Sequence, residues 1–290
     1  MTKQTSILGK LLVWRIRNIS DKQFIIGLSI LIGIVGAIAA VILKTTVHFI
    51  HNFLLSQDIV NVFYLALPFL GIFITVAFMK YILKLRVGHG IVRILQSISK
   101  NNSKLHPKGT WAYMVTSSIT VGFGGSVGLE APIVATGSSL GSYFGQLFHL
   151  NYKHKTLLIG CGAAAAIASI FNAPVTGVIF ALEVLMLDLT MSSMIPLLIA
   201  SVTGAISARF LIGDNIFLNV ELTESFIPTQ FPLFILLGIL AGFMSRYFTR
   251  ITLEIDKRIA NRKGYLRKTL IGGILIGILI FIFPPLFGDG

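Results

Sequence analysis

Long apolar runs dominate the chain and are separated by short polar segments. Runs of about twenty residues or more cover positions of about 24–56, 62–83, 191–212, 232–260 and 269–287. Each is long enough to cross a bilayer core of about 30 Å as a helix. The runs are continuous rather than alternating, and this favours helices over a closed barrel. The pattern therefore predicts an all-α integral membrane protein.

The middle of the chain predicts shorter and broken helices. The interval 109–152 contains a single acidic residue, Glu130, and no Asp, Lys or Arg, and glycines interrupt it at 122–128. It is too long for one span, so we expect two helices that meet at a glycine-rich turn inside the membrane. The small residues of about 154–170 predict a helix packed within the bundle. Pro174 suits the first turn of the following helix, which we expect to end near residue 187.

Composition and charge agree with a membrane protein. Hydrophobic residues make up 54% of the 290 residues and charged residues only 12%, against about 25% charged in soluble domains. The net charge of +13 comes from basic residues between the apolar runs and at the N-terminus. Basic residues placed in this way set the orientation of the spans and contact lipid phosphate, and this explains the charge better than binding to nucleic acid does. Cys161 is the single cysteine, which excludes a disulfide within the chain and a cysteine metal cluster. We expect no metal and no cofactor.

The N-terminal charges predict the orientation of the chain. Five basic residues precede the first apolar run: Lys3, Lys10, Arg15, Arg17 and Lys22. By the positive-inside rule, residues 1–22 form a cytoplasmic N-terminus. The sequence thus predicts a multi-pass protein of the plasma (inner) membrane.

Glu130 is the most informative single residue. An ionisable side chain inside a membrane segment costs about 3 kcal/mol or more and marks functional sites. Glycines precede Glu130, and Pro132, which suits the first turn of a helix, follows it. The first N–H groups of such a helix lack internal partners and attract anions. The carboxylate could compete with an anion and leave on protonation, which predicts a pH-sensitive gate; the alternative is a glutamate that caps a helix at an interfacial turn.

Three motifs resemble the chloride channel/transporter (CLC) family, in the family's order and spacing. The strongest are GGSVGLEAP at 124–132, similar to G-S-x-G-x-E-G-P with Ala131 at the usual glycine, and FNAPVTGVIFALE at 171–183, similar to F-N-A-P-x-x-G-x-x-F-x-x-E. GHGI at 88–91 is a weaker match to G-S-G-I-P. The resemblance implies a CLC-type bundle of tilted and broken helices in which the glutamate gates chloride and carries protons. It also implies a lipid-embedded homodimer for the full-length protein.

The resemblance further implies where the anion binds. Two helix N-termini would hold chloride, through Gly88, His89, Gly90 and Ile91 at one and Leu129 and Ala131 at the other, with Glu130 as the gate. His89 stands at the family's serine position. Its imidazole N–H can donate to an anion, or it can bond a backbone carbonyl at the interface. The backbone amides at 88–90 need no particular side chain.

Val184 bears on the transport mechanism. In family exchangers a second glutamate, which transfers protons internally, commonly follows the second motif, and here that position is Val184. Valine cannot carry a proton, and channel-type members often have an apolar residue there. We therefore predict glutamate-gated chloride transport, with a passive channel slightly favoured over proton-coupled exchange. Glu183 is interpreted as a structural residue that bonds neighbouring helix ends.

The motifs cover only the first part of the family's fold. Its transmembrane domain has two halves of inverted topology, and the G-x-F-x-P motif and the tyrosine that complete the anion site in the second half are absent here. We therefore expect a cytoplasmic N-terminus (1–22) and a partial CLC transmembrane domain (23–290) that holds the first half and linking helices, with more helices to follow in the natural product.

Two other functions fit the same sequence. A secondary transporter for another anion or a small organic acid would use the same helix termini. A truncated, inactive membrane fragment would fit the abrupt end after the last apolar run. An enzyme is not expected, because the membrane core offers no nucleophile–base pair and no metal-ligand spacing.

Overall fold

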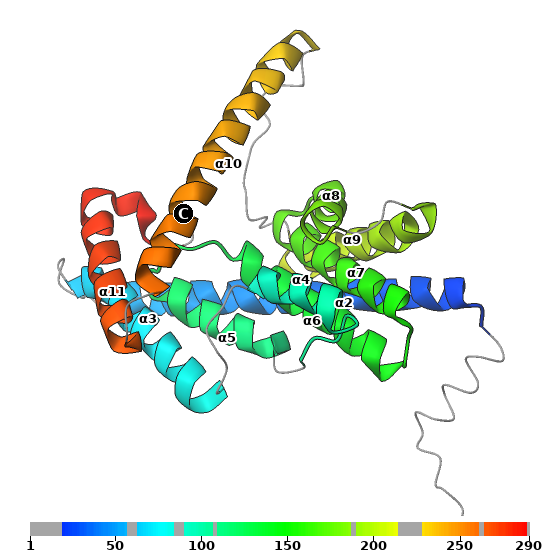
Figure 1. The fold of residues 1–290 in the computed structure, drawn as a ribbon, viewed down its shortest axis with the longest axis horizontal. Coiled ribbons are helices and arrows are strands. Elements are labelled where there is room, and N and C mark those ends of the chain that lie inside the picture. The colour runs from blue at the N-terminus through cyan, green and yellow to red at the C-terminus, as the bar shows by residue number, and fades with distance from the viewer. Residues whose placement is uncertain are drawn as a thin grey trace, which may run out of the picture.

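The computed structural model describes residues 19–56, 63–83, 90–106, 109–186, 190–213, 228–260 and 264–288. Every regular element within these ranges is a helix (Figure 1), as the apolar pattern predicts. In chain order they are α2 (Asp21–Leu55), η1 (Phe63–Ala66), α3 (Leu67–Ala77), η2 (Phe78–Leu83), α4 (Gly90–Lys100), α5 (Gly109–Gly122), α6 (Glu130–Leu147), α7 (Tyr152–Phe171), α8 (Pro174–Val184), α9 (Met191–Ile212), η3 (Pro228–Gln230), α10 (Phe231–Ala260), α11 (Tyr265–Ile282) and η4 (Pro284–Leu286).

Four of the described helices are long and apolar enough to cross a membrane. They cover Asp21–Leu54, Tyr152–Phe171, Ser192–Ile212 and Phe231–Ile259. The first has 34 residues, which at about 1.5 Å per residue is about 50 Å of helix. A helix of this length in a core of about 30 Å must tilt or extend beyond the hydrocarbon.

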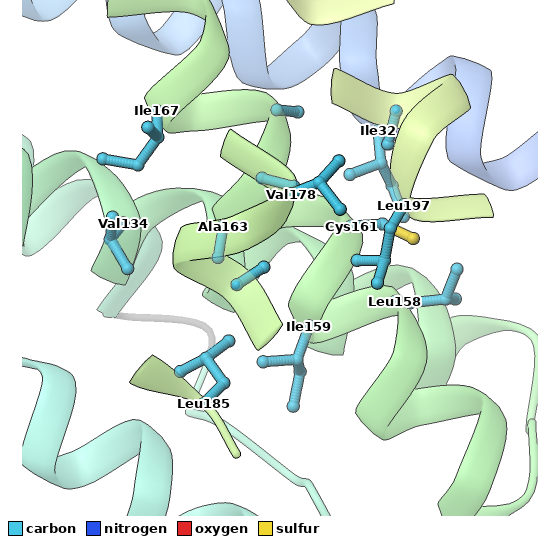
Figure 2. Packing of buried hydrophobic residues seen from close by; sticks show 14 of the residues in the cluster. Ile32, Val134, Leu158, Ile159, Cys161, Ala163, Ile167, Val178, Leu185 and Leu197 are labelled. Carbon is cyan, nitrogen blue, oxygen red and sulfur yellow. The ribbon is translucent and has the colours of Figure 1, made fainter. Parts of the chain in front are cut away.

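The core lies where α7 packs among α2, α6, α8 and α9. Figure 2 shows its apolar side chains, among them Ile32 of α2, Val134 of α6, Leu158 of α7 and Leu197 of α9. Cys161 is buried in the same cluster. The α7 segment from Leu158 to Ile170 is buried at every position. This confirms that the small-residue run is a helix packed inside the bundle.

The two predicted breaks are present. Residues 123–129 separate α5 from α6, so the interval 109–152 is indeed two helices. Asn172 ends α7 in a left-handed conformation with φ of 50°, and Pro174 opens α8. The expected end near residue 187 is too late, because α8 ends at Val184.

The last two helices lie differently from the rest. Figure 1 shows α10 extending away from the bundle, and its side chains are exposed along nearly the whole length. α11 returns to pack on α3 (Figure 1). The predicted last span, 269–287, is shifted: α11 runs from Tyr265 to Ile282. Pro284 and Pro285 cannot continue an α-helix, so a 3₁₀ turn follows.

Candidate functional site

The turn between α5 and α6 is closed by its own backbone. The N–H of Gly124 donates to Val121 O at 2.8 Å, and the N–H of Gly125 donates to Thr120 O at 2.9 Å. Gly124 has a φ of +85°, a conformation that side chains disfavour. The turn therefore ends α5 sharply and delivers the chain to the start of α6.

The N-terminus of α6 offers unpaired backbone N–H groups. Its first backbone hydrogen bond runs from the N–H of Ile133 to Leu129 O, at 3.1 Å, and Pro132 has no N–H to give. The N–H groups of Leu129, Glu130 and Ala131 make no hydrogen bond within the described residues. These amides carry the partial positive charge of the helix end and can receive an anion.

Glu130 is the first residue of α6, and its side chain is exposed. Its carboxyl group folds back over Gly128: a Cβ added at Gly128 would lie 2.9 Å from Glu130 Cδ and would overlap Oε2. No hydrogen bond or ion pair joins Glu130 to any other described residue. Its side chain therefore caps no helix end by a hydrogen bond to a described residue. The carboxylate can rotate away from Gly128 without breaking a bond.

The predicted second N-terminus is described only in part. Gly88 and His89 lie outside the described residues, so their roles stay predictions. Gly90 is the first residue of α4 and lies against α5 and α6, because a Cβ there would be 2.9 Å from Ala135 Cβ and 3.4 Å from Tyr113 Cε1. Ala135 comes five residues after Glu130, which is about 7.5 Å along the α6 axis. The fold thus brings the start of α4 beside the first turns of α6.

The remaining predicted residues are Ile91, near the start of α4, and Val184, at the end of α8. The Ile91 side chain packs on the main core cluster, so only its backbone could face an anion. Val184 is the half-buried last residue of α8. Glu183 beside it is exposed and bonds to no described residue, and its interpretation as a residue that bonds neighbouring helix ends stays a prediction.

The end of the described chain packs on the glycine-rich turn, a contact that the sequence gives no sign of. The Phe287 ring covers Gly124, where an added Cβ would lie 2.6 Å from Phe287 Cδ2 and closer still to the ring edge. The N–H of Gly288 donates to Gly124 O at 3.2 Å. The His51 ring lies 5.4 Å from the Phe287 ring, centroid to centroid. The end of α2, the turn before Glu130 and residues 287–288 therefore form one junction.

Comparison with known proteins places this architecture in a family. The family model described as voltage gated chloride channel matches residues 71–290, which is most of the chain. The chain belongs to the CLC family. The family match confirms the resemblance carried by the three motifs.

CLC relatives extend beyond the length of this chain. A protein of Methanocaldococcus jannaschii that is named only as uncharacterized is 30% identical over 270 residues, which cover 91% of this chain and 64% of that protein. The voltage-gated ClC-type chloride channel ClcB of Citrobacter koseri is 27% identical over 184 residues, 61% of this chain and 42% of ClcB. The chain thus spans less than two thirds of the length of either relative.

Solved structures confirm the CLC fold. A slow cyanobacterial Cl⁻/H⁺ antiporter matches with a TM-score of 0.75 and 22% identity, over 92% of this chain and 65% of the antiporter. A CLC-type fluoride/proton antiporter matches with a TM-score of 0.74 and 23% identity, over 90% and 66% of the two chains. The α-helical bundle with broken helices is therefore the CLC fold, as the motifs predict.

Proposed function

We propose that this CLC-family chain forms part of a chloride pathway across the membrane, with Glu130 as its gate. One observation carries the proposal: an exposed carboxylate lies at the N-terminus of α6 with three backbone N–H groups, and none of these groups has a partner among the described residues. An anion and the Glu130 carboxylate can therefore compete for the same position at the N-terminus of α6.

Electrostatics explains how such a gate works. The N-terminus of a helix carries about half a positive charge, and it can be balanced either by chloride or by the ionised Glu130 carboxylate. The absence of a side chain at Gly128 leaves room for the carboxylate against the backbone. Protonation removes the negative charge and with it the attraction to the amides. The neutral side chain then moves aside and chloride takes its place.

The start of α4 supplies the second part of the proposed site. Gly90 lies against Ala135 of α6, so amides at 88–91 can face the same region as the amides of Leu129 and Ala131. Binding by backbone groups needs no particular side chain, and His89 would add a donor. The full-length protein would act in the membrane as a homodimer, with chloride as the transported ion and no bound cofactor.

Passive flow is our preferred mechanism, because Val184 cannot take up a proton. The two solved structures are named as proton antiporters. Their sequence identities to this chain, 22% and 23%, support a shared fold but not a shared mechanism. Proton-coupled exchange is therefore the competing mechanism, and another anion, fluoride among them, is the competing substrate.

Chloride efflux from liposomes, with external pH recorded at the same time, tests the proposal. We expect efflux from the wild-type chain to rise as the pH falls, and efflux from Glu130→Ala to be independent of pH. Glu183→Ala is the matched control, since it removes another exposed carboxylate from a membrane helix and should keep the wild-type pH dependence.

Each outcome decides one element of the proposal. Proton movement in a fixed ratio to chloride would overturn passive flow, and stronger competition by an organic acid than by halides would overturn the choice of chloride. An unchanged pH dependence in a conducting Glu130→Ala chain would remove Glu130 as the gate.

A further inference from the structure

A pocket of about 570 Å³, lined mostly by residues with polar or charged side chains, lies between α4, the loop 101–106 and the α5 and α6 helices. It is far from Glu130: its lining residues Ser139 and Gln146 lie 9 and 16 residues further along α6, which is about 13 Å and 24 Å along the axis. Three basic side chains line the pocket: Arg93, Lys104 and His106. No Asp or Glu of the described residues lines it.

The hydroxyl of Ser97 is buried beside the pocket and has no partner among the described residues. Ser97 lines the pocket, is 3% exposed and has no hydrogen-bond partner for Oγ among the described residues. Serines inside helices usually donate to the carbonyl four residues back, as Ser139 does to Ala135 O at 2.7 Å in the same pocket. A buried hydroxyl without a partner destabilises the protein. Ser97 Oγ is shielded from solvent, so an acceptor atom bound in the pocket would satisfy it once the side chain turns toward the pocket.

The loop that carries Lys104 is fixed in place by α6. The N–H of Leu105 donates to Ser142 Oγ at 2.9 Å, and Ser142 Oγ donates to Ser103 O at 2.8 Å. The Gln146 side-chain amide donates to Leu105 O at 3.0 Å. The basic wall of the pocket is therefore organised before any ligand arrives, which lowers the entropic cost of binding.

A second lysine lies close to the first. Lys155 of α7 is 7% exposed, and its positive charge and that of Lys104 repel each other. An anion bound beside Lys104 would offset this repulsion, so charge as well as hydrogen bonding favours an anionic ligand.

We propose that this pocket binds a phosphate group. A phosphate brings up to two negative charges and several strong acceptor oxygens, which suit two or more cations and a serine hydroxyl better than the single charge of chloride does. The group can belong to a phospholipid headgroup or to a soluble phosphate compound. The pocket lies apart from Glu130, although Tyr113 in its lining also contacts Gly90 at the start of α4.

Thermal unfolding of the chain in lipid nanodiscs tests the proposal and separates the two sources. In one arm, nanodiscs of phosphatidylcholine are titrated with inorganic phosphate, with sodium chloride as the ionic-strength control. In the other arm, phosphatidic acid replaces part of the phosphatidylcholine. A ligand that binds the folded chain raises the unfolding midpoint. A rise with inorganic phosphate identifies a soluble phosphate ligand, and a rise with phosphatidic acid alone identifies a lipid headgroup.

Matched variants tie the effect to the pocket. Lys104→Ala should weaken phosphate binding by about tenfold, because a charge-assisted bond is lost. Ser97→Ala should weaken binding by about threefold and, since it removes the unpartnered hydroxyl, should raise the unfolding midpoint of the ligand-free chain. Lys100→Ala, at the exposed end of α4 and outside the described lining, should bind like the wild type.

Two results would overturn the proposal. One is an unfolding midpoint that neither inorganic phosphate nor phosphatidic acid changes. The other is an equal loss of binding in Lys100→Ala and Lys104→Ala, which would show a general attraction of basic residues for anions rather than a site.

Discussion

Helices α6 and α10 both carry glycines four residues apart, and the structure uses them in opposite ways. In α6, Gly137, Gly141 and Gly145 each face α7: an added Cβ would lie 2.9 Å from Ala166 Cβ, 2.9 Å from Ile159 N and 2.7 Å from Lys155 Cγ respectively. In α10, Gly238 and Gly242 have the same spacing and nothing within 4 Å. The small-residue spacing allows close helix contact, but it does not by itself supply the partner.

The surroundings of the glycines in α6 and in α10 explain the difference. Helix α7, which packs on α6, is rich in Ala and Gly. In its most apolar stretch of 18 residues, 78% of the residues are buried. The most apolar stretch of 18 residues in α10 is rich in Leu, Ile and Phe, and none of its residues is buried. Small residues on both helices let two backbones approach, whereas large side chains beside the glycines of α10 present an apolar surface suited to lipid.

The largest effect is expected from a side chain in the α6–α7 contact. Gly141→Val would press a branched side chain against the backbone of Leu158 and Ile159, which cannot move aside without separating the helices. We expect a loss of about 3 kcal/mol of stability, measured by thermal or denaturant unfolding in nanodiscs. Wild-type stability in Gly141→Val would contradict the close packing of α6 on α7.

A smaller effect, on function rather than folding, is expected at the turn before α6. Gly128→Ala would place a Cβ where the Glu130 carboxyl group lies, and overpacking of this kind costs about 1–3 kcal/mol. The carboxylate should be displaced from the α6 amides, so chloride efflux at neutral pH should rise by about tenfold. Val127→Ala is the control, because it shortens an exposed side chain of the same turn; a Gly128→Ala chain with wild-type efflux would argue against the position of the carboxylate.

The contact between Phe287 and Gly124 should contribute less. Phe287→Ala removes a half-buried ring from the junction with the turn and His51. We expect about 1–2 kcal/mol of lost stability, less than for a fully buried phenylalanine. Hydrogen exchange at residues 122–129 provides the measurement, and it should accelerate in the variant. Unchanged exchange in these residues would show that the ring does not support the turn.

The smallest effect is expected in α10. Gly242→Ala adds a methyl group where nothing lies within 4 Å, and alanine favours a helix over glycine by about 0.5–1 kcal/mol. The stability of this chain should stay the same or rise slightly in the unfolding assay used for Gly141→Val. A clear loss of stability would show that α10 packs on another segment in solution.

The sequence predicts well those features that depend on neighbouring residues. Continuous apolar runs, the glycines before Glu130 and Pro174 mark helices and their ends, because hydropathy and backbone restriction act locally. The uncapped start of α6 follows from the same residues. The family motifs add the expected function of the site as an anion site, which hydrophobic periodicity alone does not predict.

Contacts between segments that are far apart in the sequence cannot be predicted from such local patterns. Phe287 on Gly124, the pocket beside Ser97 and the exposure of α10 depend on how helices pack, and apolar side chains look alike whether they face lipid or protein. Glu183 illustrates the limit, since its place in a matching motif favours a bonded residue, whereas its side chain is exposed and bonds to no described residue. His89 belongs to the same class, because its role rests on the orientation of a side chain.

Chloride binding to the wild type and to Glu130→Gln, measured by isothermal titration at two pH values, tests the central claim most directly. If the carboxylate and chloride compete for the amides of α6, the wild type should bind chloride more tightly at the lower pH. Glu130→Gln should bind about tenfold more tightly than the wild type at neutral pH and show no pH dependence, because the competing charge is gone. Equal affinity of the two chains at both pH values would contradict the account.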